Sequence, residues 1–85
     1  MNNETNKVKV IIKRPGEVAS VEEIINDYET LKEIVGGFIE QCYSGTIKDN
    51  VAMIINEEGK LLDFKKNFNI KDYSDYVVGN AIFIR

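Results

Sequence analysis

Apolar and polar residues alternate at the start of the chain in a way that predicts a β-hairpin. Residues 7–13 alternate cleanly, which predicts a first strand with valine and isoleucine side chains facing a core and lysines facing water. Pro15 and Gly16 then suit the two central positions of a type II turn. Residues 18–24 return as a weaker second strand, which we expect to pair antiparallel with the first.

The next stretch has a helical period. Asp27 is a suitable N-cap, because its carboxylate can accept hydrogen bonds from the free N–H groups of a first turn, and a capping box of Thr30 with Glu33 ranks second. Gly36 suits the position after the helix, where a left-handed conformation is common, and Gly37 lets the chain turn sharply. The apolar residues recur at offsets of three, four and seven and gather on one face: Tyr28, Leu31, Ile34 and Val35.

Short extended runs follow the predicted helix. The aromatic and β-branched content of residues 38–43 predicts a strand. Residues 51–55 are the most apolar run and predict a central strand, covered on at least one face by the helix. Residues 56–60 predict a hairpin turn in which Gly59 takes the left-handed conformation, followed by a short return strand at 61–64.

The last part of the chain has a less regular pattern. Residues 65–70 predict a single helical turn, and residues 71–76 predict a loop or a short helix. Residues 77–85 predict a final strand in which Gly79 marks a bulge. Five residues are therefore assigned structural roles at helix ends, turns and bulges: Asp27, Gly36, Gly37, Gly59 and Gly79.

Together these elements predict a single small α+β domain. It spans residues 7–85 after a flexible tail at 1–6, with about five mostly antiparallel strands and one main helix packed on one face. The apolar runs are far shorter than the ~20 residues that cross a membrane. The N-terminus lacks the charged-then-apolar pattern of a signal peptide, so we expect a cytoplasmic protein with no membrane association.

Composition excludes several kinds of chemistry. The net charge is −3 and both signs are interspersed, which argues against nucleic-acid binding. The chain has no histidine, the usual base of a nucleophilic triad and the commonest zinc ligand. Its one cysteine, Cys42, cannot form an internal disulfide and suits packing within the sheet. We therefore expect no metal, no cofactor and no catalytic residue, and an enzyme is the less favoured class.

A polar, aromatic segment near the end of the chain is the candidate contact surface. Tyr73 and Tyr76 are three residues apart, and exposed tyrosines favour protein interfaces, although tyrosine is also common at the rim of a core. The adjacent Glu57 and Glu58 are poor candidates for acid–base catalysis, because consecutive residues on an exposed turn do not converge on one point. The candidate partner surface comprises Tyr73, Tyr76, Asp72 and Asp75.

Three blocks of the sequence carry a resemblance to a known family. Residues 31–40 contain Val-Gly-Gly-aromatic-Ile-Glu, residues 56–61 read Asn-Glu-Glu-Gly-Lys-Leu, and residues 77–79 read Val-Val-Gly before an apolar strand. The chain thus resembles a small uncharacterised family, classed as a domain of unknown function, found in phages, plasmids and conjugative elements of Firmicutes and other bacteria. Members often carry a Pro-Asn-Arg-like segment, of which residues 65–68 keep the asparagine but not the arginine. The resemblance implies a mobile-element origin and no particular activity.

Small size, acidic charge, the missing catalytic groups and this resemblance predict a non-enzymatic protein-binding module. It would be an accessory factor of a phage or mobile element that acts on a protein partner. The alternatives are an inhibitor that mimics nucleic acid, a small-ligand binder or carboxylate- or tyrosine-based enzyme, and a structural subunit whose homodimer interface is its only specific surface. The mimic requires five carboxylates on one face: Glu22, Glu23, Asp27, Glu29 and Glu33.

Overall fold

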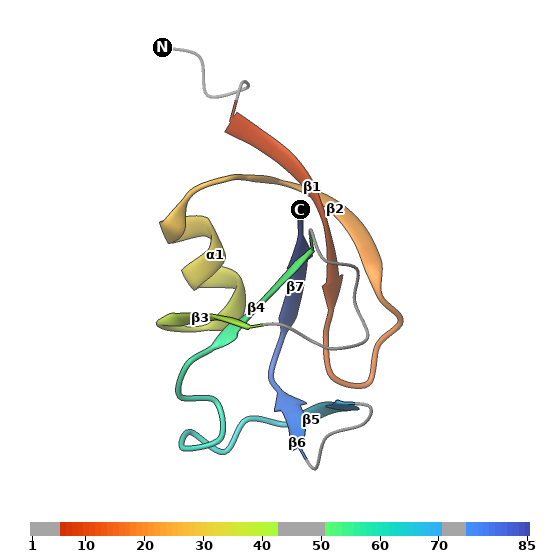
Figure 1. The fold of residues 1–85 in the computed structure, drawn as a ribbon, viewed down its shortest axis with the longest axis vertical. Helices are drawn as coiled ribbons and strands as arrows, with labels where there is room; N and C mark the ends of the chain where they lie inside the picture. Colours follow the sequence, from red (N-terminus) through yellow and green to blue (C-terminus); the bar gives the residue numbers. More distant parts are fainter. Residues whose placement is uncertain (1–5, 43–50, 71–74) are drawn as a thin grey trace.

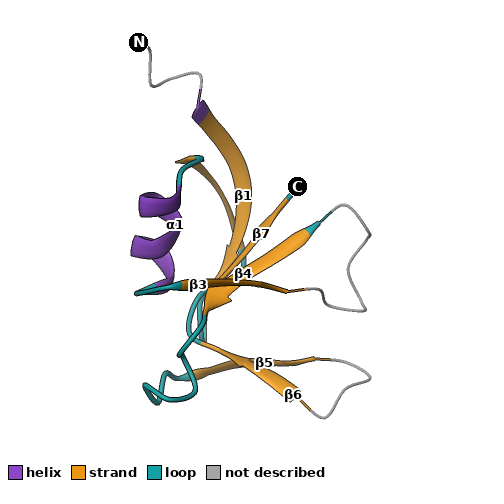
Figure 2. Cartoon of the chain, turned by 60° about the vertical axis from the view of Figure 1, so that its left-hand side comes forward, coloured by secondary structure: helices purple, strands orange, loops and turns teal. Residues whose placement is uncertain are grey.

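A five-stranded sheet lies between a helix and a two-stranded ribbon (Figures 1 and 2). The structure is a computed structural model that describes residues 6–42, 51–70 and 75–85. Strands β5 and β6 form the two-stranded ribbon. The elements in chain order are β1 (Lys7–Lys13), β2 (Ser20–Ile25), α1 (Tyr28–Val35), β3 (Ile39–Cys42), β4 (Ala52–Asn56), β5 (Lys66–Ile70), β6 (Asp75–Val78) and β7 (Ala81–Ile84).

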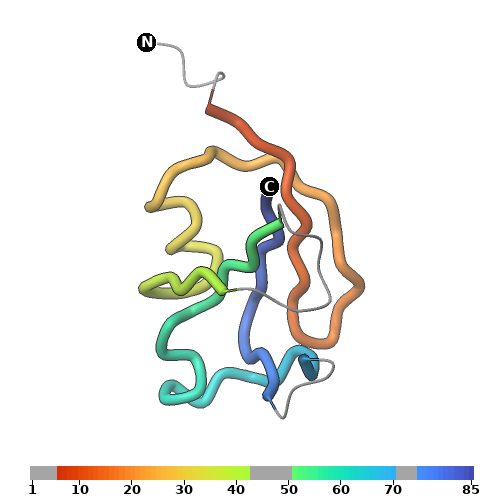
Figure 3. Tube along the Cα trace, in the orientation of Figure 1, coloured from red at the N-terminus to blue at the C-terminus, as the bar shows by residue number. Residues whose placement is uncertain are grey.

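The large sheet is antiparallel throughout and has the order β2-β1-β7-β4-β3. The first hairpin forms as predicted, with β1 paired to β2 and the Glu17 N–H donating to the Arg14 carbonyl oxygen at 3.1 Å in the turn. The strand β7 lies between β1 and β4 (Figure 3). The prediction of about five strands was too low, since the described residues form seven strands in two sheets.

Two hydrophobic cores lie on the opposite faces of this sheet. The adjacent residues Met53 and Ile54 of β4 are both buried, and their side chains enter different cores. This explains the continuous apolar run at 51–55, because β4 is covered on both faces. The core on the helix side contains Val10, Ile12, Val35, Ile54 and Ile82, and the core on the ribbon side contains Met53, Val77 and Ala81 with Phe68, Ile70 and Phe83 against them.

Helix α1 has the ends that the sequence predicts. The Asp27 carboxylate accepts a hydrogen bond from the Thr30 N–H at 2.8 Å, and Gly36 takes a left-handed conformation with its N–H donating to the Lys32 carbonyl oxygen. Leu31, Ile34 and Val35 pack towards the core. Tyr28, the fourth residue of the predicted apolar face, is not part of this core, and 46% of its surface is exposed.

The helix cap makes the stability of the protein depend on pH in a predictable direction. The backbone hydrogen bond from Thr30 lowers the pKa of Asp27. The contribution of the Asp27 carboxylate to the free energy of unfolding is therefore fully present above the ordinary aspartate pKa of about 3.9. It is lost as the pH falls through the lower pKa of the folded state. Asp27→Asn should keep most of the cap, because asparagine is an equally good N-cap, and should lose stability less steeply below about pH 4 in urea unfolding. Identical pH profiles for both proteins would contradict this.

Three predictions near the end of the chain were wrong. Residues 61–64 form a turn and not a return strand, with Asp63 in the left-handed conformation that was expected at Gly59. Residues 65–70 contain strand β5 and not a helical turn. The expected single strand at 77–85 is two strands of different sheets, because Gly79, at φ 73°, turns the chain between them.

Asn67 explains why β5 forms where a helical turn was expected. Its side-chain amide donates to the Lys13 carbonyl oxygen at 2.7 Å and to the Gly79 carbonyl oxygen at 2.8 Å, and its side-chain oxygen accepts from the Lys13 ammonium at 3.0 Å. These bonds join the ribbon to the large sheet. Asn67 is the asparagine retained in the Pro-Asn-Arg-like segment, and its contacts give it a structural role.

Candidate functional site

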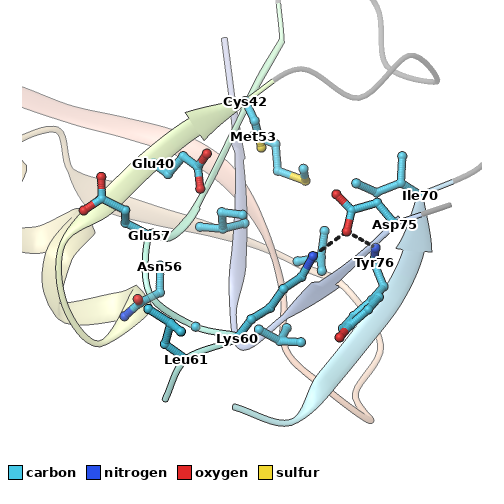
Figure 4. Close-up of a pocket in the computed structure, with 14 residues that line it drawn as sticks. Glu40, Cys42, Met53, Asn56, Glu57, Lys60, Leu61, Ile70, Asp75 and Tyr76 are labelled. Carbon is cyan, nitrogen blue, oxygen red and sulfur yellow. Dashed lines mark hydrogen bonds and ion pairs between the residues drawn. The ribbon is translucent and has the colours of Figure 1, made fainter. Parts of the chain in front are cut away.

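A groove opens between the large sheet and the ribbon (Figure 4). It has a volume of about 330 Å³ and is bordered by strands β3 and β4, the turn after β4, and strand β6. Three sheet residues line it with apolar side chains, here called the apolar floor: Cys42, Met53 and Ile55. The charged side chains of Glu40, Glu57, Lys60 and Asp75 lie around them and form the rim (Figure 4). This combination of an apolar floor with a few polar groups is typical of a binding site.

The rim of the groove carries an excess of negative charge. Three carboxylates line it, from Glu40, Glu57 and Asp75, against one ammonium from Lys60, which leaves two negative charges in excess. Lys60 and Asp75 form an ion pair across the groove (Figure 4). Their mutual hydrogen bond raises the pKa of Lys60 and lowers the pKa of Asp75, so both groups are charged at neutral pH.

An aromatic ring lies beside this ion pair. The Lys60 ammonium is 4.4 Å from the centre of the Tyr76 ring, and the Lys66 ammonium is 5.5 Å from it. Both distances are within the range of a cation–π interaction. The groove therefore already holds a cation between a carboxylate and an aromatic ring, supplied by the chain's own Lys60.

Two titratable groups of the groove, Asp75 and Cys42, have pKa shifts in the direction that disfavours acid or nucleophilic chemistry at neutral pH. A general acid at neutral pH needs a raised carboxyl pKa, whereas the pKa of Asp75 is lowered by Lys60. Burial raises the pKa of the Cys42 thiol, which keeps it in the poorly nucleophilic protonated form. Within the described residues no group of three or more histidine, cysteine or acidic side chains is arranged to hold a metal ion.

The structure places part of the candidate partner surface at this groove. Asp75 and Tyr76 line it, with 42% of the Tyr76 surface exposed, whereas Asp72 and Tyr73 lie outside the described residues. Sequence reasoning missed Glu40 and Lys60, which come from separate segments. The available signal was the Asn-Glu-Glu-Gly-Lys-Leu block, because five of its six residues line the groove: Asn56, Glu57, Gly59, Lys60 and Leu61.

Asn56 holds the wall of the groove against the end of the helix. Its side chain is 5% exposed, and its amide donates to the Val35 carbonyl oxygen at 3.1 Å while its oxygen accepts from the Glu58 N–H at 2.7 Å. The bond to Val35 satisfies one of the carbonyl groups that every helix end leaves free. A Cβ atom at Gly37 would lie 2.9 Å from the Asn56 amide nitrogen, so glycine allows this close approach.

The ring of Phe64 lies close to three glycines, one of which, Gly59, also lines the groove. A Cβ atom at Gly36 or Gly59 would lie 3.7 Å or 3.5 Å from the ring, and one at Gly79 would lie 2.8 Å from it. Gly59 is also close to β6, because its Cβ would lie 2.8 Å from a methyl group of Val78. Three of the four glycines that the sequence singles out therefore lie around the Phe64 ring.

The described residues form a small α+β domain with an open groove between its two sheets. The chain belongs to a family described as a domain of unknown function (DUF3846), whose model matches residues 8–85. This finding supports the resemblance to an uncharacterised family. No curated protein and no solved structure gives a significant match. No helix among the described residues has the length and apolarity to cross a membrane.

Proposed function

We propose that this domain is a non-enzymatic protein-binding module whose groove holds a segment of a partner protein with a basic side chain. The observation that carries the proposal is the apolar floor beneath a rim with two excess negative charges. A segment with apolar side chains and one arginine or lysine would match both features. Following the family resemblance, we place the module as an accessory factor of a phage or mobile element.

Exposed apolar side chains next to the groove support a protein partner. Leu61 and Leu62, on the turn that closes one end, have 85% and 54% of their surface exposed. A single exposed leucine is common on protein surfaces, but here two consecutive leucines are exposed, and Leu61 also lines the groove. Exposed apolar side chains beside polar groups are typical of interaction sites.

The proposal is tested with peptides and two matched charge variants. Random heptapeptides displayed on phage should yield sequences in which a basic residue is flanked by apolar ones. Glu40→Gln with Glu57→Gln should weaken binding of the enriched peptides roughly threefold to tenfold, since a screened charge pair contributes about 0.2–1 kcal/mol. Glu29→Gln with Glu33→Gln, at two exposed positions of α1 that do not line the groove, removes the same charge and should leave the affinity unchanged.

Two results would count against the proposal. Enriched peptides without basic residues would show that charge complementarity does not select the partner. An equal loss of affinity in both double variants would show that net charge alone matters and that the groove is not the site. Titrations should be repeated at two salt concentrations, because salt weakens contacts between exposed charges.

The groove also supports a small-ligand binder as a second candidate function, because its volume lies at the lower end of the usual range for such sites. The acidic mimic of nucleic acid has less support. Of its carboxylates, Glu22 forms an ion pair with Arg14, and Asp27 caps the helix. Glu23 lies opposite Lys9 in the β1–β2 register. Most of the expected negative surface is thus engaged by neighbouring groups of the same chain.

A further inference from the structure

Strand β6 presents its edge to the groove. Strand β3 lines the groove with the alternate residues Glu40 and Cys42, and β4 does so with Met53 and Ile55 before its last residue, Asn56, at the start of the turn. Since successive side chains of a strand point to opposite faces, alternate residues show that a face lines the groove. By contrast, β6 contributes the four consecutive residues 75–78, as expected when the edge of a strand lies along it.

This edge is open to another strand. Within the described residues β6 pairs with β5 alone, so the backbone groups on its other side have no strand partner. The Tyr76 N–H instead donates to the carboxylate of the preceding residue, Asp75, at 2.7 Å. An unpaired edge with free backbone groups is the kind of surface to which extended peptides add.

The side chain of Lys60 lies at this edge of β6. Its ammonium binds the Asp75 oxygen that also accepts from the Tyr76 N–H, so one carboxylate oxygen holds both groups (Figure 4). The long side chain of Lys60 therefore lies across the edge of β6. Charged side chains, lysine above all, are a common means of keeping an edge strand from pairing.

We propose that a partner segment binds by adding as a strand to the edge of β6, and that the Lys60–Asp75 ion pair is the gate it displaces. This inference rests on the proposed function and names its binding mode. The Tyr76 N–H would donate to a backbone carbonyl of the segment in place of Asp75. The freed Asp75 carboxylate would pair with the basic side chain of the segment, which takes the position that Lys60 holds beside the Tyr76 ring.

The chemistry of the segment follows from what surrounds the edge. One face of the added strand would lie on the apolar floor, and its basic residue would face Asp75. Asp75 and Val77 lie on the same face of β6, and Val77 packs with Met53 of the floor, so the arginine and the apolar residues of the segment must share one face. The probe is the peptide acetyl-Thr-Val-Thr-Arg-Thr-Val-Thr-amide, titrated by nuclear magnetic resonance against the whole chain.

N-methylation of the peptide tests strand addition directly. In an added strand, N–H groups point alternately towards β6 and away from it. We therefore compare two peptides that each carry three N-methyl groups, one peptide with them on one set of alternate residues and the other with them on the intervening residues. Their affinities should differ by at least about tenfold, since each backbone hydrogen bond contributes ~0.5–1.5 kcal/mol. The Tyr76 amide should show one of the larger shifts. Equal affinities would overturn strand addition while leaving binding in the groove intact.

The gate is tested by substitution at Lys60. Lys60→Gln removes the ion pair and should raise the affinity several-fold, whereas Lys60→Arg keeps the pair and should not. A peptide with citrulline in place of arginine should still bind Lys60→Gln more tightly than the native chain, which separates opening of the edge from the change in charge. A gain confined to the arginine peptide would overturn the gate. If no peptide binds either protein, the proposed function fails together with this inference.

Discussion

Replacing Asn56 by aspartate is expected to lower the free energy of unfolding at pH 7 by about 3 kcal/mol or more, because a nearly buried amide donor becomes a carboxylate. Asn56 is 5% exposed and donates to the Val35 carbonyl oxygen. The substituted carboxylate keeps an acceptor for the Glu58 N–H but places its second oxygen against that carbonyl. The helix end and the groove wall are strained by the same change.

The loss of stability in Asn56→Asp should depend on pH, and this dependence tests its cause. Burial beside a carbonyl oxygen should raise the pKa of the new carboxyl group in the folded state, so the penalty is present above that pKa and shrinks as the pH falls. Urea unfolding at pH 7 and near pH 5 should show the difference. Asn69→Asp, the same change at an exposed position of β5, should stay within about 0.5 kcal/mol of the native chain. Equal losses in the two variants would contradict the role of Asn56.

Gly79→Ala is the second substitution with a large expected effect. At φ 73° an alanine costs about 1–2 kcal/mol of conformational energy. Its Cβ would also lie 2.8 Å from a ring carbon of Phe64, which forces the ring to move and adds about 1–3 kcal/mol. The expected total is roughly 2–5 kcal/mol in urea unfolding.

Gly16→Ala is the matched control, because it has the same kind of backbone conformation without the steric contact. Gly16 has φ 77°, and the nearest atom to its Cβ would be the flexible end of Lys65 at 4.0 Å. It should lose only the conformational energy. In a double-mutant cycle, Phe64→Leu should partly relieve Gly79→Ala, since the smaller side chain leaves room for the new methyl group. Additive effects would show that the ring is not what requires a glycine at this position.

The sequence predicted the elements that local chemistry determines. The first hairpin and both ends of α1 depend on residues close together in the chain, such as the turn at 14–17 and the cap of Asp27. The end of the chain depends on distant contacts. Strand β5 is held by Asn67 at the backbone of Lys13, and no local period reveals that partner. The propensity of residues 65–70 was therefore a poor guide.

The candidate site was only partly predictable for the same reason. Asp75 and Tyr76 attract attention as exposed polar and aromatic residues, and both line the groove. Glu57 was set aside as the tip of an exposed turn. The Glu57 N–H donates to the Phe38 carbonyl oxygen at 2.8 Å, which places the turn beside β3 and its Glu40. This proximity of two carboxylates arises from strand pairing and cannot be read from their positions in the sequence.

The central place of β7 has a consequence for the way the protein folds. The β1–β2 hairpin and the β3–β4 pair each form from nearby residues, but β7 joins them by pairing with β1 on one side and β4 on the other. Ile11 is the register partner of Phe83, although the two residues lie near opposite ends of the sequence. Closing so long a loop is slow, because its entropy is lost before the contacts form. The insertion of β7 between the two strand pairs should therefore be the slow step of folding.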